Sequence, residues 1–186
     1  MINASSEVIY KGAKGGVPML MLGILLLFTL FGIPVAIFIF CGLVLVNPNQ
    51  ARVVLLFGIY KGTLREAGFY WVNPFSNRRP VSLRAHNFNS EHLKVNDLRG
   101  NPIEIGAVVV WRVRNTAQAV FDVEDHQSYV EVQTESALRH LASLHPYDTP
   151  HENETSLRGS SDAINQQFQI ELEQRLARAG IEVLEG

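Results

Sequence analysis

Residues 17–46 read VPMLMLGILLLFTLFGIPVAIFIFCGLVLV, a run of 30 residues without Asp, Glu, Lys, Arg or His. A helix rises 1.5 Å per residue, so this run would reach about 45 Å, whereas the hydrocarbon core of a bilayer is about 30 Å thick. The run is also too long for the apolar part of a signal peptide. We therefore expect an integral membrane protein, with an N-terminal flank over residues 1–16 and a transmembrane segment over residues 17–46.

The path of this segment through the bilayer has two interpretations. One tilted helix accounts for the run and predicts a single-pass protein, whereas two full spans would need about 40 apolar residues. Gly32 and Pro34 lie near the middle of the run, however, and Pro34 can kink the helix or form the tip of a shallow re-entrant loop. Basic residues flank both ends of the run in similar numbers, so the membrane side of the following domain stays open.

Beyond residue 46 the chain has the size of one or two small domains. Residues 47–186 hold 14 basic and 17 acidic residues, a balance of −3, and the basic residues are scattered. We therefore expect no nucleic-acid partner. Cys41 is the only cysteine and lies in the apolar run, which excludes an intramolecular disulfide, a cysteine-based zinc site and a thiol nucleophile in the remaining chain.

The first part of this domain has strand patterns. Residues 51–57 are rich in β-branched and aromatic side chains, and Gly58 and Gly62 indicate a turn around Tyr60 and Lys61. Short strands are also predicted near residues 63–65, 81–85 and 93–95. Residues 103–113 alternate with a period of two over eleven residues, which predicts one long strand.

The pattern then changes to helices. Asn115 and Asp125 have the residue types that cap helices, and the second of these helices carries an apolar stripe and ends before Pro146. Ser161 is expected to cap a third helix, with Gly180 as its left-handed terminator and a strand from Ile181. Strands followed by helices predict an α+β fold after the membrane segment.

Three stretches resemble the stomatin/prohibitin/flotillin (SPFH, band 7) family. They are NPNQARVVLLFGIYKGTLREAGFYWVNPF (47–75), VSLRAHNFNSEHLKVNDLRGNPIEIGAVVVWRV (81–113) and VEVQTESALRHLAS (130–143). The resemblance implies an SPFH domain over residues 47–186. Its first half is mostly β and lies against the membrane, its second half mixes strands and helices, and we expect a subdivision near residues 96–101.

Members of this family usually continue into a long C-terminal helix that closes subunits into rings or cages. That helix has no counterpart before Gly186, so we expect either a fragment of a longer protein or a chain without the ring-closing part. The resemblance implies a non-enzymatic scaffold in a cell membrane, with the bacterial inner membrane as the expected location. Such a scaffold self-associates and organises a membrane microdomain and partner membrane proteins, including proteases. The alternatives are a monomeric adaptor for one partner and a membrane-tethered hydrolase.

Two sets of residues are candidates for contacts of such a scaffold. Trp and Tyr favour the headgroup level of a bilayer, which makes the aromatic cluster that follows the apolar run a candidate membrane interface, although an ordinary β-core explains it equally well. Charges of both signs on the second and third helices are candidates for contacts between identical subunits, although most charged helix surfaces are simply solvated. The aromatic candidates are Phe69, Tyr70, Trp71 and Phe75, and the charged candidates are Glu131, Glu135, Arg139, Glu171, Arg175 and Arg178.

Enzymatic and metal chemistry have weaker support. Among six histidines, His140 and His145 are five residues apart and so do not share a helix face as a zinc pair would. Ser143, His145 and Asp148 are the components of a hydrolase triad, but no Gly-x-Ser-x-Gly elbow accompanies them. We therefore expect no catalytic residues, no metal and no cofactor.

Overall fold

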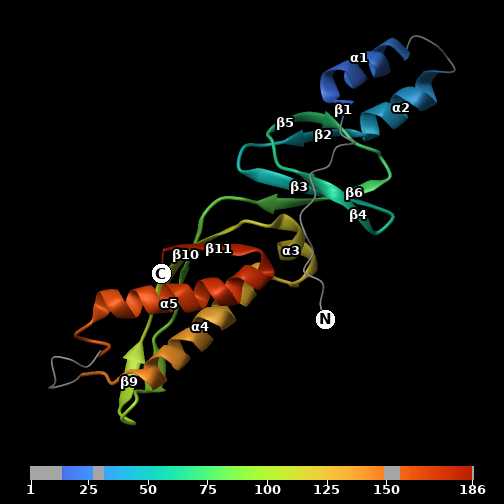
Figure 1. Ribbon diagram of the computed structural model, residues 1–186. Coiled ribbons are helices and arrows are strands. Elements are labelled where there is room, and N and C mark those ends of the chain that lie inside the picture. Colours follow the sequence, from blue (N-terminus) through green and yellow to red (C-terminus); the bar gives the residue numbers. More distant parts are fainter. Residues whose placement is uncertain (1–13, 27–31, 149–155, 186) are drawn as a thin grey trace. The chain divides into compact units, whose positions relative to one another are not determined.

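The computed structural model describes residues 14–26, 32–148 and 156–185 (Figure 1). The chain divides into two compact units, the first over Ser6–Arg84 and the second containing Ala85–Gly186. This division lies earlier than the subdivision expected near residues 96–101. Much of the flank over residues 1–16 lies outside the described residues.

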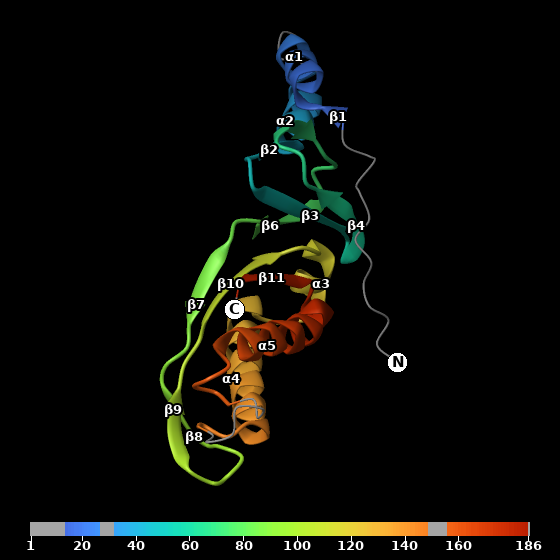
Figure 2. The same cartoon turned by 60° about the vertical axis from the view of Figure 1, so that its left-hand side comes forward.

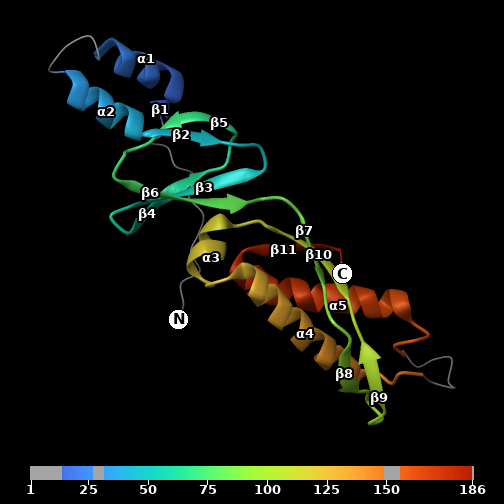
Figure 3. The ribbon, with the colours of Figure 1, turned by 180° about the vertical axis from the view of Figure 1, so that it is seen from behind.

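The described part of the apolar run forms two helices and a strand instead of one helix. Helices α1 (Gly16–Leu26) and α2 (Ile33–Cys41) lie side by side (Figures 1 and 3), and β2 (Leu43–Val46) follows. Residues 27–31, between the helices, lie outside the described residues. Gly32 is the N-cap of α2 and Pro34 lies in its first turn, where the missing N–H of proline leaves no hydrogen bond unmade. Within the described ranges, no helix is both long enough and apolar enough to cross a membrane.

Two three-stranded antiparallel sheets form the rest of the first unit. One has the strand order β1-β5-β2 and the other β4-β3-β6. Small branched side chains from both sheets form its core, namely Val44, Val46, Val54, Leu64 and Val72. The strands are β1 (Lys14–Gly15), β3 (Gln50–Leu56), β4 (Ile59–Leu64), β5 (Gly68–Trp71) and β6 (Ser76–Ser82).

The turn between β3 and β4 differs from the expectation. Leu56 pairs with Ile59, so the turn consists of Phe57 and Gly58, while Tyr60 and Lys61 belong to β4. Both turn residues have positive φ, +50° and +83°. Positive φ at both positions matches the right-handed twist of adjacent strands in a two-residue hairpin.

The second unit contains a sheet with the order β11-β10-β7 and a separate β8–β9 ribbon. The single strand expected over residues 103–113 is wrong, because it breaks between Ile105 and Val108 and its two parts pair with different neighbours. At the break, Ala107 N donates to Ser90 Oγ (2.8 Å) and Ser90 N donates to Ala107 O (2.9 Å). In Figure 2 the ribbon lies beyond β7 and β10. The strands are β7 (His86–Asn89), β8 (Leu93–Asn96), β9 (Pro102–Ile105), β10 (Val108–Val113) and β11 (Ile181–Glu185).

The helices of the second unit begin mostly where the capping pattern predicts. The side chain of Asn115 accepts hydrogen bonds from two main-chain N–H groups of α3, and Asp125 does the same for α4. Gly180 ends the last helical segment with φ +69°. The N-cap of α5 is Ser160 and not Ser161, and its side chain makes no capping bond. The helices are α3 (Thr116–Phe121), α4 (His126–Leu144), α5 (Ser161–Leu176) and the 3₁₀ turn η2 (Ala177–Ala179).

The apolar stripes of α4 and α5 face inward, and α5 packs against β11. The two helices lie side by side (Figures 1 and 3). Eight of the nine expected stripe residues are buried, and the exception is Leu144 at the end of α4, which is 44 % exposed. The buried ones are Val130, Ala137, Leu138, Leu141, Ile164, Phe168, Leu172 and Leu176.

Candidate functional site

The C-terminal end of α2 is fastened to the sheets of the first unit. Trp71 Nε1 donates to Ile39 O (2.9 Å), and the Arg78 guanidinium donates to Cys41 O (2.8 Å) and Leu43 O (3.4 Å). Ile39 O also accepts from Gly42 N (3.1 Å), whereas Cys41 O is one of the carbonyls that a helix end leaves without an intrahelical partner, and a cation is favourable there. Burial lowers the pKa of Arg78, and nearby Arg52 lowers it further, but an arginine stays protonated in proteins.

The four aromatic candidates divide into two groups. Phe69 packs on Gly16, where a Cβ atom would overlap its ring, and Tyr70 packs against the valine core. Trp71 is half-buried and holds α2. Phe75 is 64 % exposed. Three of the four therefore have structural contacts, and Phe75 alone presents most of its ring to the surroundings.

Phe75 belongs to a larger exposed surface that was not found from the sequence. Its ring centroid lies 5.8 Å from that of Phe38 in α2 and 6.3 Å from that of Phe57 in the β3–β4 turn. Phe57 is 80 % exposed and Ile59, next to the same turn, 62 %. We call Phe38, Phe57, Ile59 and Phe75 the apolar rim. The sequence signal that could have revealed this surface is the Phe57–Gly58 pair between two strand patterns. Such a pair forms a two-residue turn with a bulky side chain at its tip.

Exposed apolar side chains continue along the N-terminal helix pair. Met21 and Leu25 of α1 are 66 % and 68 % exposed, and several residues of α2 are also exposed. Contiguous apolar patches on a protein surface mark interaction sites with proteins or membranes. The helix pair and the apolar rim are therefore the candidate interface of the first unit.

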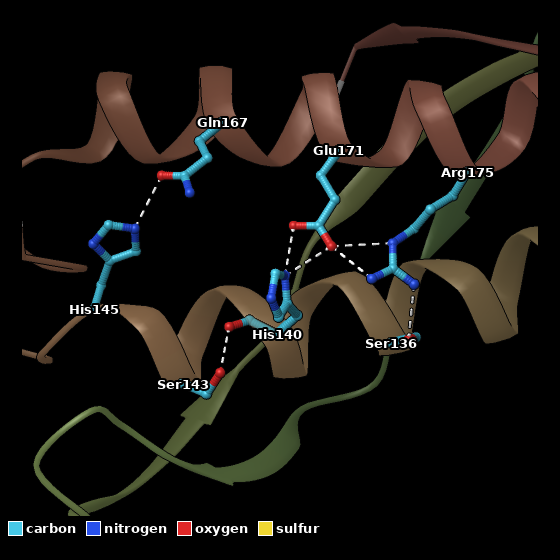
Figure 4. Close-up of polar contacts among 7 residues, drawn as sticks. All are labelled: Ser136, His140, Ser143, His145, Gln167, Glu171 and Arg175. Carbon is cyan, nitrogen blue, oxygen red and sulfur yellow. Dashed lines mark hydrogen bonds and ion pairs between the residues drawn. The ribbon is translucent and has the colours of Figure 1, made fainter.

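The second unit has a polar cluster between α4 and α5 (Figure 4). His140 Nδ1 lies 2.9 and 3.0 Å from the two carboxylate oxygens of Glu171. Arg175 donates to Glu171 Oε1 through Nε (3.0 Å) and Nη2 (2.6 Å), and to Ser136 Oγ through Nη1 (3.1 Å). Burial raises the pKa of Glu171, but these hydrogen bonds and charges outweigh it, and the net pKa is lowered.

This cluster changes the interpretation of the charged candidates. Across the α4–α5 contact of their own chain, Glu171 bonds to His140 and Arg175 bonds to Ser136. Glu131, Arg139 and Arg178 are exposed, and Glu135 is half-buried. A groove of about 900 Å³ runs between the two helices, and Arg178 lies on its wall. Of the charged candidates, Glu131, Arg139 and Arg178 are thus the ones with the exposure that an intermolecular contact requires.

The chain also matches a known protein family. The SPFH domain / Band 7 family model matches residues 44–185, from β2 to β11. The chain belongs to the SPFH/band 7 family. The resemblance expected from the sequence is confirmed, and so is the α+β content of the SPFH domain. No curated protein matches the chain at a significant level. Membership of the family is consistent with a general role as a membrane scaffold.

The candidate hydrolase residues of this SPFH domain are bonded to other groups. Ser143 Oγ donates to His140 O (2.7 Å), and His145 Nε2 lies 2.9 Å from Gln167 Oε1 (Figure 4). Asp148 Oδ2 accepts from Arg158 Nη1 (3.1 Å). The three side chains are thus not joined as a triad. In the described part of the chain, no group of three or more His, Cys, Asp or Glu residues could hold a metal ion.

Proposed function

We propose that this SPFH protein is a membrane scaffold whose first unit is seated in a bilayer by the N-terminal helix pair. The observation that carries the proposal is the exposure of apolar side chains on α1 and α2, of which Leu25 at 68 % is the largest. In water this surface would be costly, at roughly 25 cal/mol for each Å² of apolar area left exposed. A hydrocarbon environment removes that cost.

The lengths of the two helices favour a re-entrant segment over a single membrane-spanning helix. The described α1 and α2 have 11 and 9 residues, or about 16 and 14 Å at 1.5 Å per residue, roughly half the thickness of a hydrocarbon core. Gly23 of α1 lies against Phe40 and Ile39 of α2, so the helices pack on each other near the end of α2. A packed pair of this length fits one leaflet and returns the chain to the side from which it entered.

Cysteine labelling distinguishes the two topologies. In a Cys41→Ser background, Ser6→Cys and Asn47→Cys place single thiols before and after the helix pair. In oriented vesicles, re-entry predicts that an impermeant maleimide labels both thiols from the same side. Labelling from opposite sides would establish a single pass in place of re-entry.

The scaffold function also includes self-association and partner binding. Exposed charges on α4 and on η2, among them Glu131, Arg139 and Arg178, are suited to lateral contacts between copies. The proposed partners are membrane proteins, including proteases, and the proposed location is a cell membrane, with the bacterial inner membrane as the first choice. We also propose that the chain has no catalytic activity of its own.

Carbonate extraction tests the membrane component of this proposal. The protein should stay in the pellet at alkaline pH, because apolar burial does not depend on ionic contacts. Its release into the supernatant would contradict the proposal and leave a peripheral adaptor. A hydrolase assay on the purified protein, with Ser143→Ala as the control, tests the enzymatic alternative, which requires activity that this variant abolishes.

A further inference from the structure

The two units of the chain carry opposite charges. Residues 6–84 hold eight basic and two acidic residues, a net charge of +6, whereas residues 85–186 hold eight basic and sixteen acidic residues, a net charge of −8. The whole chain has a net charge of only −2. Between residues 47 and 84 the single acidic residue is Glu66, which cannot neutralise the six basic residues of that segment. The unit that bears the apolar rim is therefore strongly cationic.

The most exposed residue of the apolar rim is held in an unfavourable backbone conformation. Phe57 has φ +50°, in the left-handed region that costs a residue with a side chain about 1–2 kcal/mol. Asn or Asp is the usual residue at this turn position, and neither would expose an aromatic ring. A strained and exposed aromatic residue points to a function for its side chain at the tip.

Exposed basic side chains lie on the two strands that pair with β3 behind this tip. The pairing of Leu56 with Ser76 brings the β3–β4 turn next to Phe75. Lys61 follows two residues after Ile59 in β4, and Arg79 lies in β6 opposite Val53 of β3; both are exposed. Apolar side chains that enter the acyl boundary, with cations at headgroup level, are the arrangement by which proteins bind anionic membrane surfaces.

We propose that the apolar rim and its flanking cations dock the first unit on the headgroups of anionic phospholipids in a bilayer. This inference rests on the proposed membrane scaffold and adds its lipid class. Phe57 and Phe75 insert at the acyl boundary, while Lys61 and Arg79 pair with the phosphates. The net charge of −8 gives the second unit the opposite preference, so an anionic surface attracts one unit and repels the other.

A tryptophan at the tip tests the contact directly. Full-length Phe57→Trp protein is reconstituted into vesicles that contain brominated lipids, made either of phosphatidylcholine alone or with about a third of phosphatidylglycerol. The unsubstituted chain contains Trp71 and Trp111, so its quenching by bromine is subtracted to give the contribution of residue 57. We expect this contribution to be at least twofold stronger in the anionic vesicles than in the phosphatidylcholine vesicles. This excess should shrink at 1 M salt, where the Debye length is only about 3 Å. Ile170→Trp, exposed on α5 of the second unit, is the matched control and should show no excess.

Charge reversal tests the role of the cations. Each basic residue near an anionic surface strengthens binding about fivefold, from about 1 kcal/mol per residue. Lys61→Glu with Arg79→Glu should therefore abolish the excess quenching of residue 57. Lys94→Glu with Arg158→Glu changes the net charge equally at two exposed ion pairs of the second unit, and should leave the excess in place.

The outcomes separate this inference from the proposed function. If the protein stays with the vesicles but residue 57 is quenched equally in neutral and anionic lipid, the lipid selectivity is wrong and the scaffold proposal stands. If residue 57 is quenched in neither lipid while the protein remains bound, the apolar rim does not contact the bilayer. Loss of the protein from both kinds of vesicle would instead contradict the membrane seating itself.

Discussion

The indole N–H of Trp71 donates a hydrogen bond of 2.9 Å to the main-chain oxygen of Ile39. This bond joins the end of β5, the central strand of its sheet, to the last turn of α2. Gly42 makes the bond possible, because a Cβ atom there would overlap the indole ring. Trp71 is thus a structural link between the folded sheets and the helix pair, which is a different role from a freely exposed interfacial aromatic.

We predict that Trp71→Phe loosens the end of α2 without unfolding the first unit. The variant keeps an aromatic ring beside Phe38 but loses the hydrogen bond, which is worth about 1 kcal/mol. Hydrogen exchange should become faster in a peptide that spans residues 33–46. Trp111→Phe, in the second unit, is the control and should leave this peptide unchanged. Unchanged exchange in Trp71→Phe would show that the indole bond does not hold α2.

Asp97 gives the second unit a pH dependence. Its buried carboxylate accepts main-chain hydrogen bonds from Tyr147 (3.0 Å), Arg99 (2.9 Å) and Asn101 (2.7 Å), so it joins the β8–β9 turn to the segment after α4. The bond from Tyr147 contributes most, and together these bonds outweigh desolvation and lower the pKa of Asp97 from 3.8 to about 2. A lowered pKa stabilises the folded state above about pH 4, and this contribution is lost as the pH falls from about 4 to about 2.

We predict that Asp97→Asn lowers the Tm of the protein in detergent by a few degrees at pH 7. The difference in Tm between the variant and the unsubstituted chain should shrink as the pH falls from about 4 to about 2, because protonation removes the charge that the variant already lacks. Asp162→Asn, an exposed residue in the first turn of α5, serves as the control. A constant difference in Tm across this pH range would contradict the assignment.

The polar cluster between α4 and α5 predicts a separation of stability from assembly. Glu171→Gln removes the charge that His140 and Arg175 share, so thermal stability should fall while the oligomeric state stays the same. The double variant Arg139→Glu with Arg178→Glu should instead dissociate the oligomer and leave thermal stability the same, because both side chains are exposed. Size-exclusion chromatography and thermal unfolding of the same samples measure both effects. If Glu171→Gln dissociates the oligomer, Glu171 contributes to a contact between subunits and the prediction is wrong.

Two glycines with similar φ allow a steric contact to be measured. Gly180 (φ +69°) and Gly100 (φ +82°) both disfavour a side chain, but a Cβ at Gly180 would meet Asn115 O, whereas nothing lies within 4 Å of one at Gly100. Gly100→Ala should cost about 1 kcal/mol from the backbone conformation alone. Gly180→Ala should cost clearly more, as the free energy of unfolding in urea would show. An equal loss of unfolding free energy in the two variants would mean that Asn115, the N-cap of α3, can move away from the added Cβ.

Local signals predicted much of the second unit, because they depend on neighbouring residues only. Asn115 and Asp125 cap their helices through side chains that reach N–H groups two or three residues ahead. The strand break at Gly106 and Ala107 was missed because Ser90, sixteen or seventeen residues away, supplies the bonds that hold it. Alternation of side chains alone does not report such a distant partner.

The candidate site was harder to predict for the same reason. Glu171 and Arg175 have the residue types of an intermolecular contact, and only the approach of α4 shows that they are bonded within the chain. Phe57 escaped detection because a bulky residue is unusual at a turn with positive φ. The charge balance of −3 after the apolar run concealed a cationic and an anionic part, which became visible once the division at Arg84 was known.

The central claim is that this SPFH protein is a self-associating scaffold seated in a membrane. The most direct measurement is electron-microscopic imaging of the full-length protein in lipid nanodiscs, with the particle mass measured on the same sample. The account predicts closed assemblies of many copies, with the helix pair and the apolar rim of every copy in contact with the lipid. Single copies in nanodiscs and in several mild detergents would contradict the scaffold and leave an adaptor for one partner.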